Sequence, residues 1–177
     1  MDDAVVWSKD RLLRWPDFQA EFNPAALEDA HSAIRFRPTW TVDSDSRDDQ
    51  IMFHVEGLVI HTEFLPPLSW VRPTESTERL LLHERGRFDL AELVRCEKTC
   101  ILQKDFEKKL FPTRGKNEEQ RRQFAKVDSG RMIALKLEDV MRAFEVRSAK
   151  YDKETDFGRD VSGQSRYAEI FARLRSV

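Results

Sequence analysis

The sequence predicts an α+β fold, in which a small antiparallel sheet is followed by long helices packed on one of its faces. Alternating apolar and polar residues fill much of the first third of the chain, whereas apolar residues three or four apart dominate from residue 76 onward. A chain of 177 residues is long enough for one hydrophobic core, and no linker, repeat or low-complexity segment divides it. We therefore expect a single domain over residues 1–177.

Two stretches carry the alternation that is typical of half-buried strands. In residues 33–42 the apolar side chains share one parity, and Pro38 predicts an edge strand or a bulge. The acidic segment 43–49 is expected to be a turn. Alternation resumes in residues 51–64, but its phase changes at Gly57, which predicts a β-bulge or a break between two strands.

The helical part of the chain begins after a proline-rich loop. Thr74 or Ser76 is expected to cap a long helix over about residues 76–108. On a helical wheel His83 and Arg87 fall on the apolar stripe, so both side chains are expected to point inward. Because a buried guanidinium without an acid is very unfavourable, Arg87 requires a carboxylate partner.

The remaining pattern is also mainly helical. Apolar spacing predicts a helix through residues 124–144, which the segment 128–130 (DSG) caps and restarts. Residues 151–164 are rich in turn formers and are expected to form a loop. Residues 165–177 have the spacing of a closing amphipathic helix.

Charge and composition narrow the classes of partner. The 30 Lys and Arg residues are interleaved with 32 Asp and Glu residues, for a net charge of −2, so no nucleic-acid-binding surface is expected. No apolar run reaches the roughly 20 residues of a membrane span. The first ten residues lack the features of a signal peptide, although a signal removed from the natural protein would leave no trace, so the compartment stays open.

Two cysteines stand four residues apart in the long predicted helix. At this spacing the Cβ atoms lie about 5–6 Å apart, too far for an unstrained disulfide. Cys96 and Cys100 are therefore expected to be free, partly buried thiols.

Four segments carry a resemblance to a known family. They are RLLRWPDFQ (11–19), SWV (69–71), LLLHERGRFDLAEL (80–93) and YDKETDFG (151–158). In this order they resemble the L-x-W-x-D-F opening, the mid-chain loop, the H-E-x-x-H-F-D-x-A-E helix and the Y-D-x-E-T-x-H-G segment of a bacterial domain-of-unknown-function family described as secreted zinc-dependent proteases. The resemblance implies a zincin-like metallopeptidase fold, and a periplasmic or secreted location if a signal was removed. It also implies packing or supporting roles for Asp89 and Glu92.

The departures from the family pattern fall on the metal site itself. In an H-E-x-x-H helix the two histidines bind zinc and the glutamate acts as general base on a metal-bound water. Here His83 and Glu84 match the first ligand and the base, but Arg87 replaces the second histidine and Phe157 stands at the third-ligand position. Arginine is a charged donor and cannot bind a dication. Thus His83 is the only surviving ligand, and Glu84 would be catalytic only with a bound metal.

The exchange at position 87 suggests that the guanidinium takes the place of the lost cation. We expect it to pair with carboxylates around the former site, for which the candidates are Glu84, Asp152, Glu154 and Asp156. The ring of Phe157 would fill the third-ligand space and exclude water. No cofactor is expected, unless zinc is held by other residues.

Three functions remain open. The leading hypothesis is a non-catalytic relative of a zinc peptidase that binds an unknown protein or peptide. The second is a metal-dependent hydrolase with rearranged ligands, such as His83, Asp152 or Asp156 and a distant histidine, with Glu84 activating the water. His61 is then the preferred third ligand, and His31 and His54 are expected to be ordinary sheet or surface histidines. The third is a site that holds a small anion on Arg87.

Overall fold

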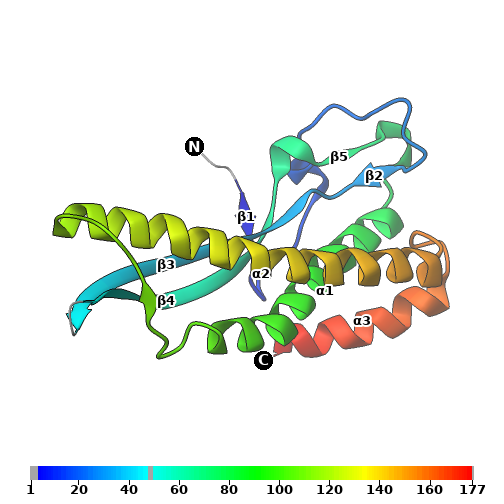
Figure 1. Cartoon of the computed structure of the whole chain (residues 1–177). Helices are drawn as coiled ribbons and strands as arrows, with labels where there is room; N and C mark the ends of the chain where they lie inside the picture. Colours follow the sequence, from blue (N-terminus) through cyan, green and yellow to red (C-terminus); the bar gives the residue numbers. More distant parts are fainter. Residues whose placement is uncertain (1–3, 48–49, 177) are drawn as a thin grey trace.

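The computed structural model describes residues 4–47 and 50–176, and this part of the chain forms an α+β fold with a small antiparallel sheet and three long helices (Figure 1). A separate two-stranded sheet builds a lobe beside the N-terminal end of the first helix. The strands are β1 (Val5–Val6), β2 (Ala30–His31), β3 (Ile34–Arg47), β4 (Gln50–Phe64), β5 (Trp70–Val71) and β6 (Phe111–Pro112), and the helices are α1 (Glu78–Lys104), α2 (Glu118–Thr155) and α3 (Val161–Ser176).

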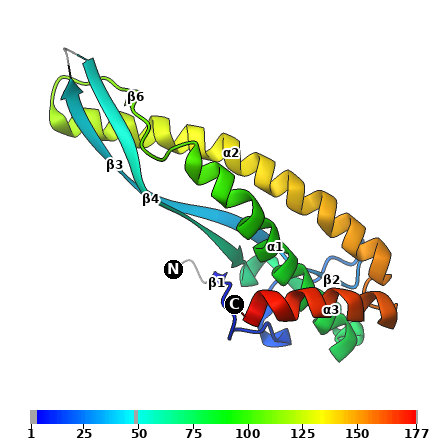
Figure 2. The same ribbon diagram turned by 90° about the horizontal axis from the view of Figure 1, so that it is seen from below.

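The main sheet is built around β4. It pairs with β3 along one edge and with β1 and β6 along the other, always antiparallel. β3 is therefore an edge strand, which confirms the expectation from Pro38 and places this residue where a missing N–H is tolerated. β3 and β4 form a long hairpin whose tip extends beyond α1 (Figure 2).

The acidic segment is a strand over residues 43–47, where the sequence predicts a turn. β3 continues to Arg47 and β4 begins at Gln50, and the last two positions of the predicted turn, 48–49, lie outside the described residues. The reason is the partner strand: the apolar run that starts at Ile51 pairs with this acidic segment and extends the ladder.

The phase change at Gly57 is a β-bulge, and β4 does not break there. Pairing passes from Thr39 opposite Val59 to Thr41 opposite Glu56, so one β3 residue faces two β4 residues. Gly57 has a φ of +58°, a conformation that glycine adopts without strain. As a consequence the apolar residues on both sides of the bulge lie in the core.

The helices α1 and α2 cover the same face of the sheet. Phe36 of β3 and Thr62 of β4 are direct cross-strand partners, so their side chains lie on one face. Phe36 packs edge-on against Phe144 of α2, and Thr62 donates a hydrogen bond to Glu92 of α1. α3 packs on α1 and α2 on the side away from the sheet, as Figures 1 and 2 show together.

The first helix starts later and ends earlier than predicted. Its N-cap is Thr77, whose hydroxyl accepts the Leu80 amide at 3.2 Å. Neither Thr74 nor Ser76 has this role, because Thr74 lies in a 3₁₀ turn and the Ser76 hydroxyl donates back to Pro73. The helix ends at Lys104 rather than near residue 108.

The second helix is continuous over 38 residues, about 57 Å, and contradicts two predictions. The segment 128–130 does not interrupt it, because Ser129 is buried and accepts a hydrogen bond from the Trp40 indole at 2.9 Å, while Gly130 lies against the same ring. Residues 151–155 are helical as well, since Tyr151 and Thr155 are fully buried. The predicted loop 151–164 is reduced to residues 156–160, and the closing helix begins at Val161.

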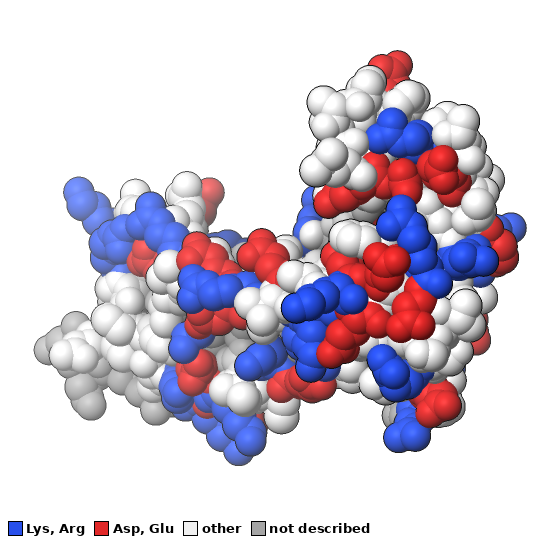
Figure 3. All heavy atoms as spheres, turned by 90° about the vertical axis from the view of Figure 1, so that its right-hand side faces the viewer, with Lys and Arg blue, Asp and Glu red and all other residues white. Residues whose placement is uncertain are grey.

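The two cysteines and the charged side chains lie on the surface. Cys96 and Cys100 are free as expected but exposed, because Thr99 and Leu102 occupy the buried side of this part of α1. Basic and acidic side chains are interleaved on the face that Figure 3 shows. Within the described residues, no helix is both long enough and apolar enough to cross a bilayer.

The close approach of α1 to α2 gives a first test. A Cβ atom at Gly86 would lie 2.2 Å from the Tyr151 hydroxyl, whereas one at Gly130 would make ordinary contact with Trp40 at 3.4 Å. Both glycines are inside helices. Gly86→Ala should lower the free energy of unfolding by about 1–3 kcal/mol, and Gly130→Ala should raise it by up to about 1 kcal/mol. Urea unfolding measures both, and equal effects would contradict this packing.

Candidate functional site

The helix α1 is buried on several sides and carries buried acids as well as apolar residues. Asp89 is 5% exposed and accepts hydrogen bonds from the Trp7 indole at 2.8 Å and from two nitrogens of Arg175 at 2.5 and 3.0 Å. Burial raises the pKa of Asp89, and the contacts with Arg175 and Trp7 oppose that rise. Glu92 accepts the Thr62 hydroxyl at 2.7 Å. These two acids tie both ends of the chain and the sheet to α1.

A two-point ion pair joins α1 to α2 two residues before Asp89. The Nη2 atom of Arg87 lies 2.8 Å from Oδ1 of Asp152, and Nη1 lies 3.3 Å from Oδ2. Nη1 also donates to the Ser148 hydroxyl at 3.0 Å. The side chains of Arg87 and Asp152 are 19% and 17% exposed, so the pair is largely withdrawn from water.

Glu84 is the second carboxylate at this guanidinium. Its Oε2 atom lies 3.5 Å from Nε of Arg87 and accepts the Ser32 hydroxyl at 2.5 Å. Nε of Arg87 is buried and has no hydrogen-bond partner among the described residues. Burial acts to lower the pKa of Arg87, but the negative charges of Glu84, Asp152 and Glu28 outweigh it and raise that pKa above its ordinary value. The arginine therefore keeps its charge.

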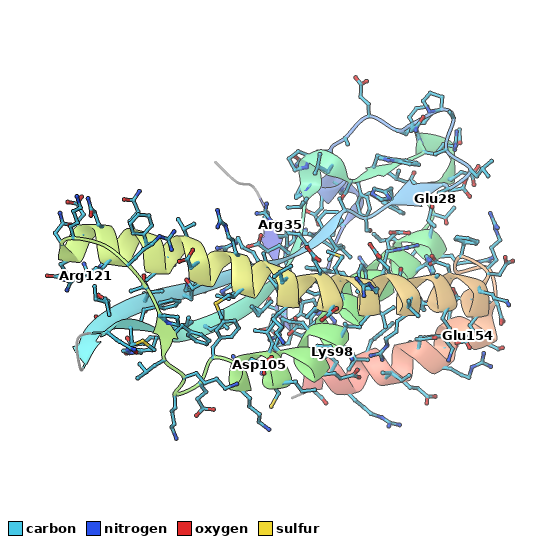
Figure 4. The ribbon with its side chains drawn as sticks, in the orientation of Figure 1. Glu28, Arg35, Lys98, Asp105, Arg121 and Glu154 are labelled. Atoms are coloured by element: carbon cyan, nitrogen blue, oxygen red, sulfur yellow. The ribbon has the colours of Figure 1, made fainter. Side chains whose placement is uncertain are left out.

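The other two candidate partners of Arg87 lie elsewhere. Glu154 accepts the Tyr167 hydroxyl at 2.6 Å and lies on the side of α2 that faces α3 (Figure 4). Asp156 is the C-cap of α2, in the left-handed conformation, and its side chain is exposed. Of the four carboxylates that the sequence suggests, Asp152 and Glu84 contact the guanidinium.

His83 points inward, as the helical wheel predicts, and is fully buried. Its ring stacks on Tyr151 with the centroids 4.6 Å apart. Nε2 lies 3.1 Å from Oδ1 of Asp152 and 3.5 Å from Nη2 of Arg87, while Nδ1 faces the Thr155 hydroxyl at 3.3 Å and Oε1 of Gln164 at 3.4 Å. Both ring nitrogens are thus engaged by neighbouring side chains.

Phe157 does not fill the space beside His83, contrary to the prediction. Its side chain is 44% exposed, and its ring centroid lies 6.4 Å from that of His83. The backbone explains this position, because Asp156, Phe157 and Gly158 all have positive φ and turn the chain sharply after α2. Gly158 covers the histidine instead, since a Cβ atom there would lie 2.8 Å from the Cβ atom of His83.

The other histidines do not join His83. His61 is adjacent in β4 to Thr62, which faces α1, so its side chain lies on the opposite face of the sheet, 3.3 Å from the Thr39 hydroxyl. His54 contacts Glu56 at 2.8 Å. His31 stacks on Trp70. Together with Arg87 and Asp152 it borders a surface groove, which is described below. Of the three, His31 is the one that this groove brings together with Arg87, and the preference for His61 was wrong.

These residues do not fit a zinc ion. In the described ranges no three His, Cys, Asp or Glu side chains are placed to hold a metal together. The two ligand-type groups that do meet, His83 and Asp152, both contact the guanidinium of Arg87. A dication would have to occupy space beside this fixed positive charge, which is electrostatically unfavourable.

Two hollows border Arg87, and neither was foreseen from the sequence. The first, which we call the groove, lies between residues 31–34, the loop at Leu65 and Leu68, and residues 141–152 of α2, and has a volume of about 530 Å³. The second, which we call the Glu28 cavity, has a volume of about 290 Å³. It is bordered by residues 27–30, by the side of α1 that bears Arg87 and by the chain around Phe157. Each combines segments distant in sequence, which periodicity cannot bring together.

Comparisons with known proteins give no relative for this chain. No protein-family model, no curated protein and no solved structure matches it. The resemblance to zinc-dependent proteases therefore depends on the four sequence motifs, and the function has to be argued from the geometry around Arg87.

The Arg87 and Asp152 pair can be tested by a double-mutant cycle. Because both groups are largely buried, Arg87→Met and Asp152→Asn should each destabilise the protein, and their coupling free energy should be about 1–3 kcal/mol. The pair Arg122 and Glu118 has a similar separation of 2.9 Å on the exposed surface of α2, and its coupling should be close to zero. Urea unfolding of both cycles measures this, and equal couplings would contradict a buried central pair.

Proposed function

We propose that this protein is a non-catalytic peptide-binding domain on a zincin-like metallopeptidase scaffold. One observation carries the proposal: the guanidinium of Arg87 lies where His83, Glu84 and Asp152 converge. In a zinc peptidase helix the histidines and the catalytic glutamate converge on the metal instead. The motif resemblance and this geometry together support a scaffold in which a side-chain cation has replaced a bound one.

The same contacts argue against hydrolysis by Glu84. A general base in this position needs a metal-bound water whose pKa the cation has lowered. The Glu84 carboxylate is instead buried, bonded to Ser32 and placed 3.5 Å from Arg87. A rearranged metal set would have to begin with His83 and Asp152, and Arg87 contacts both. The hydrolase alternative therefore lacks an available pair of ligands.

A small anion on Arg87 is also disfavoured by charge. Asp152 already takes two of the three guanidinium nitrogens, and Glu84 lies beside the third. Glu28 adds a further negative charge that acts on the same group. An incoming anion would meet three carboxylates around one guanidinium, so Arg87 offers no net positive charge for it.

The groove offers backbone hydrogen-bonding groups to a peptide. Ala33 uses its carbonyl for the Leu65 amide at 2.9 Å and its amide for the Ser69 hydroxyl at 3.0 Å, so its backbone faces the 65–69 loop. Ser32 and Ile34 also border the groove, and Ile34 begins β3, the edge strand of the main sheet. An edge strand leaves amides and carbonyls unpaired along one side. An extended peptide could pair with this edge as an added strand.

The walls of the groove suit the side chains of such a peptide. Most of its lining is apolar, contributed by Ile34, Leu65, Leu68, Met141, Phe144 and Ala149. Leu68 is 59% exposed, which leaves apolar surface for a partner to cover. A bound strand would thus gain main-chain hydrogen bonds along one side and side-chain contacts with α2 along the other.

Selection from a library of unstructured decapeptides with free amino termini tests this proposal. We expect selected peptides to bind the folded protein saturably by fluorescence anisotropy, and Ala149→Trp to weaken them at least about tenfold by filling the groove. Methylation of single peptide amides should weaken binding at alternate positions, because every second amide pairs with the edge.

Ala172→Trp on the exposed surface of α3 is the matched control and should leave the affinity unchanged. If no decapeptide binds, the proposed function is wrong. Equal loss with Ala149→Trp and Ala172→Trp would show that the peptides bind outside the groove.

Zinc titration addresses the non-catalytic part of the proposal. Because Arg87 holds a positive charge against His83 and Asp152, we expect no stoichiometric zinc binding at micromolar concentrations by isothermal titration calorimetry. One zinc per chain with sub-micromolar affinity, abolished in His83→Ala, would refute the proposal and favour the hydrolase.

A further inference from the structure

The Glu28 cavity is bordered by the Glu28 carboxylate, which has few contacts with the rest of the protein. In the described part of the chain the only ion contact of Glu28 is with His31, at 3.9 Å, which is too long for a hydrogen bond. Its side chain is 56% exposed. The other acid at this mouth, Asp29, is already paired with Arg159 at 3.2 Å and with Arg72 at 3.7 Å. Glu28 is thus the acid that remains available to a ligand.

Arg87, which borders the cavity, has one donor without a hydrogen-bond partner among the described residues. Nε of Arg87 is buried and makes no hydrogen bond within the described residues. The two terminal nitrogens of the same guanidinium are held by Asp152, which fixes the direction of Nε. Oε2 of Glu84 lies 3.5 Å from Nε, so a negative charge faces this donor without forming a hydrogen bond.

The rest of the lining is apolar at the rim. Leu27 is fully exposed and Phe157 is 44% exposed, and Leu80 lies with them around the cavity. The lining therefore offers an acceptor with negative charge and an apolar border. Figure 4 places Glu28 on the lobe, near the end of the molecule where α2 meets α3.

We propose that the Glu28 cavity binds the free amino-terminal residue of the peptide that occupies the groove. The α-ammonium group pairs with Glu28, and the first side chain packs on Leu27, Leu80 and Phe157. Arg87 borders both hollows, so the cavity and the groove are neighbours. In the proposed complex the following residues of the peptide continue into the groove. This inference rests on the proposed function and names the end of the partner that the site recognises.

Charge decides between the two ends of a peptide. Three carboxylates border the cavity, Glu28, Asp29 and Glu84, against the guanidiniums of Arg87 and Arg159. Both arginines are already paired, with Asp152 and Asp29. A C-terminal carboxylate would add a negative charge to this excess, whereas an ammonium group neutralises part of it.

Two sets of probes separate this inference from the proposed function. The first is a selected decapeptide with a free amino terminus, with an acetylated amino terminus and with an amidated carboxyl terminus. The second is leucine amide and its N-acetyl derivative, which are small enough to occupy the cavity without the groove. Binding of the peptides is measured by fluorescence anisotropy, and binding of the amides by chemical-shift perturbation in NMR spectra.

Acetylation should weaken the decapeptide about tenfold or more, because it removes a charge-assisted hydrogen bond, and amidation of the carboxyl end should change little. Leucine amide should shift the resonances of residues around the cavity, and its acetyl derivative should not. In Glu28→Gln the preference for the free amine should fall by the same factor. Glu21→Gln, an exposed acid of the same lobe outside the cavity, should keep it.

Different outcomes would overturn this inference and the proposed function. Equal binding of free and acetylated decapeptides overturns the inference and leaves the groove in place. Weaker binding of the amidated peptide also overturns it, since the cavity would then hold a carboxylate. If leucine amide binds through Glu28 but no decapeptide does, the cavity stands and the proposed groove is wrong.

Discussion

The buried contact of Arg87 with Asp152 is the interaction on which the site depends. A guanidinium in the interior is tolerated only with a carboxylate beside it, so the sequence of α1 can place an arginine on its buried side only if α2 supplies an acid there. Asp152 meets this requirement because α2 continues without interruption to Thr155. Had the chain formed a loop from residue 151, Asp152 would not have a fixed position opposite Arg87.

The close packing of α1 and α2 has the same origin. Gly86 allows the Tyr151 hydroxyl to approach the helix backbone, where it donates to the His83 carbonyl at 3.1 Å. The ring of Tyr151 then stacks on His83, and Asp152, the next residue, is brought to both His83 and Arg87. A small residue, an aromatic ring and an ion pair thus form one unit, in which each contact places the next.

The sequence predicts the order of the elements and the inward direction of His83 and Arg87, because both follow from local periodicity. A change of phase in the residues themselves also predicts a β-bulge or a break at Gly57, and the structure has the bulge. The continuity of α2 could not be predicted, because the Trp40 contact with Ser129 overrides the local turn signal. The position of Phe157 depends on three consecutive positive φ values. Of these three residues, Gly158 is the one whose type predicts a positive φ. The groove and the Glu28 cavity arise from tertiary contacts and leave no periodic signal.

The charge balance around Arg87 links the proposed scaffold to the proposed ligand. The zinc ion of a peptidase helix carries two positive charges, whereas the guanidinium of Arg87 carries one. Glu84 and Asp152 remain beside it, and Glu28 acts on it across the cavity. The region is therefore left with more negative than positive charge, and among the described residues Glu28 has no ion pair with a lysine or an arginine. A site with this excess of negative charge is better suited to a ligand ammonium group than to an anion, because opposite charges attract.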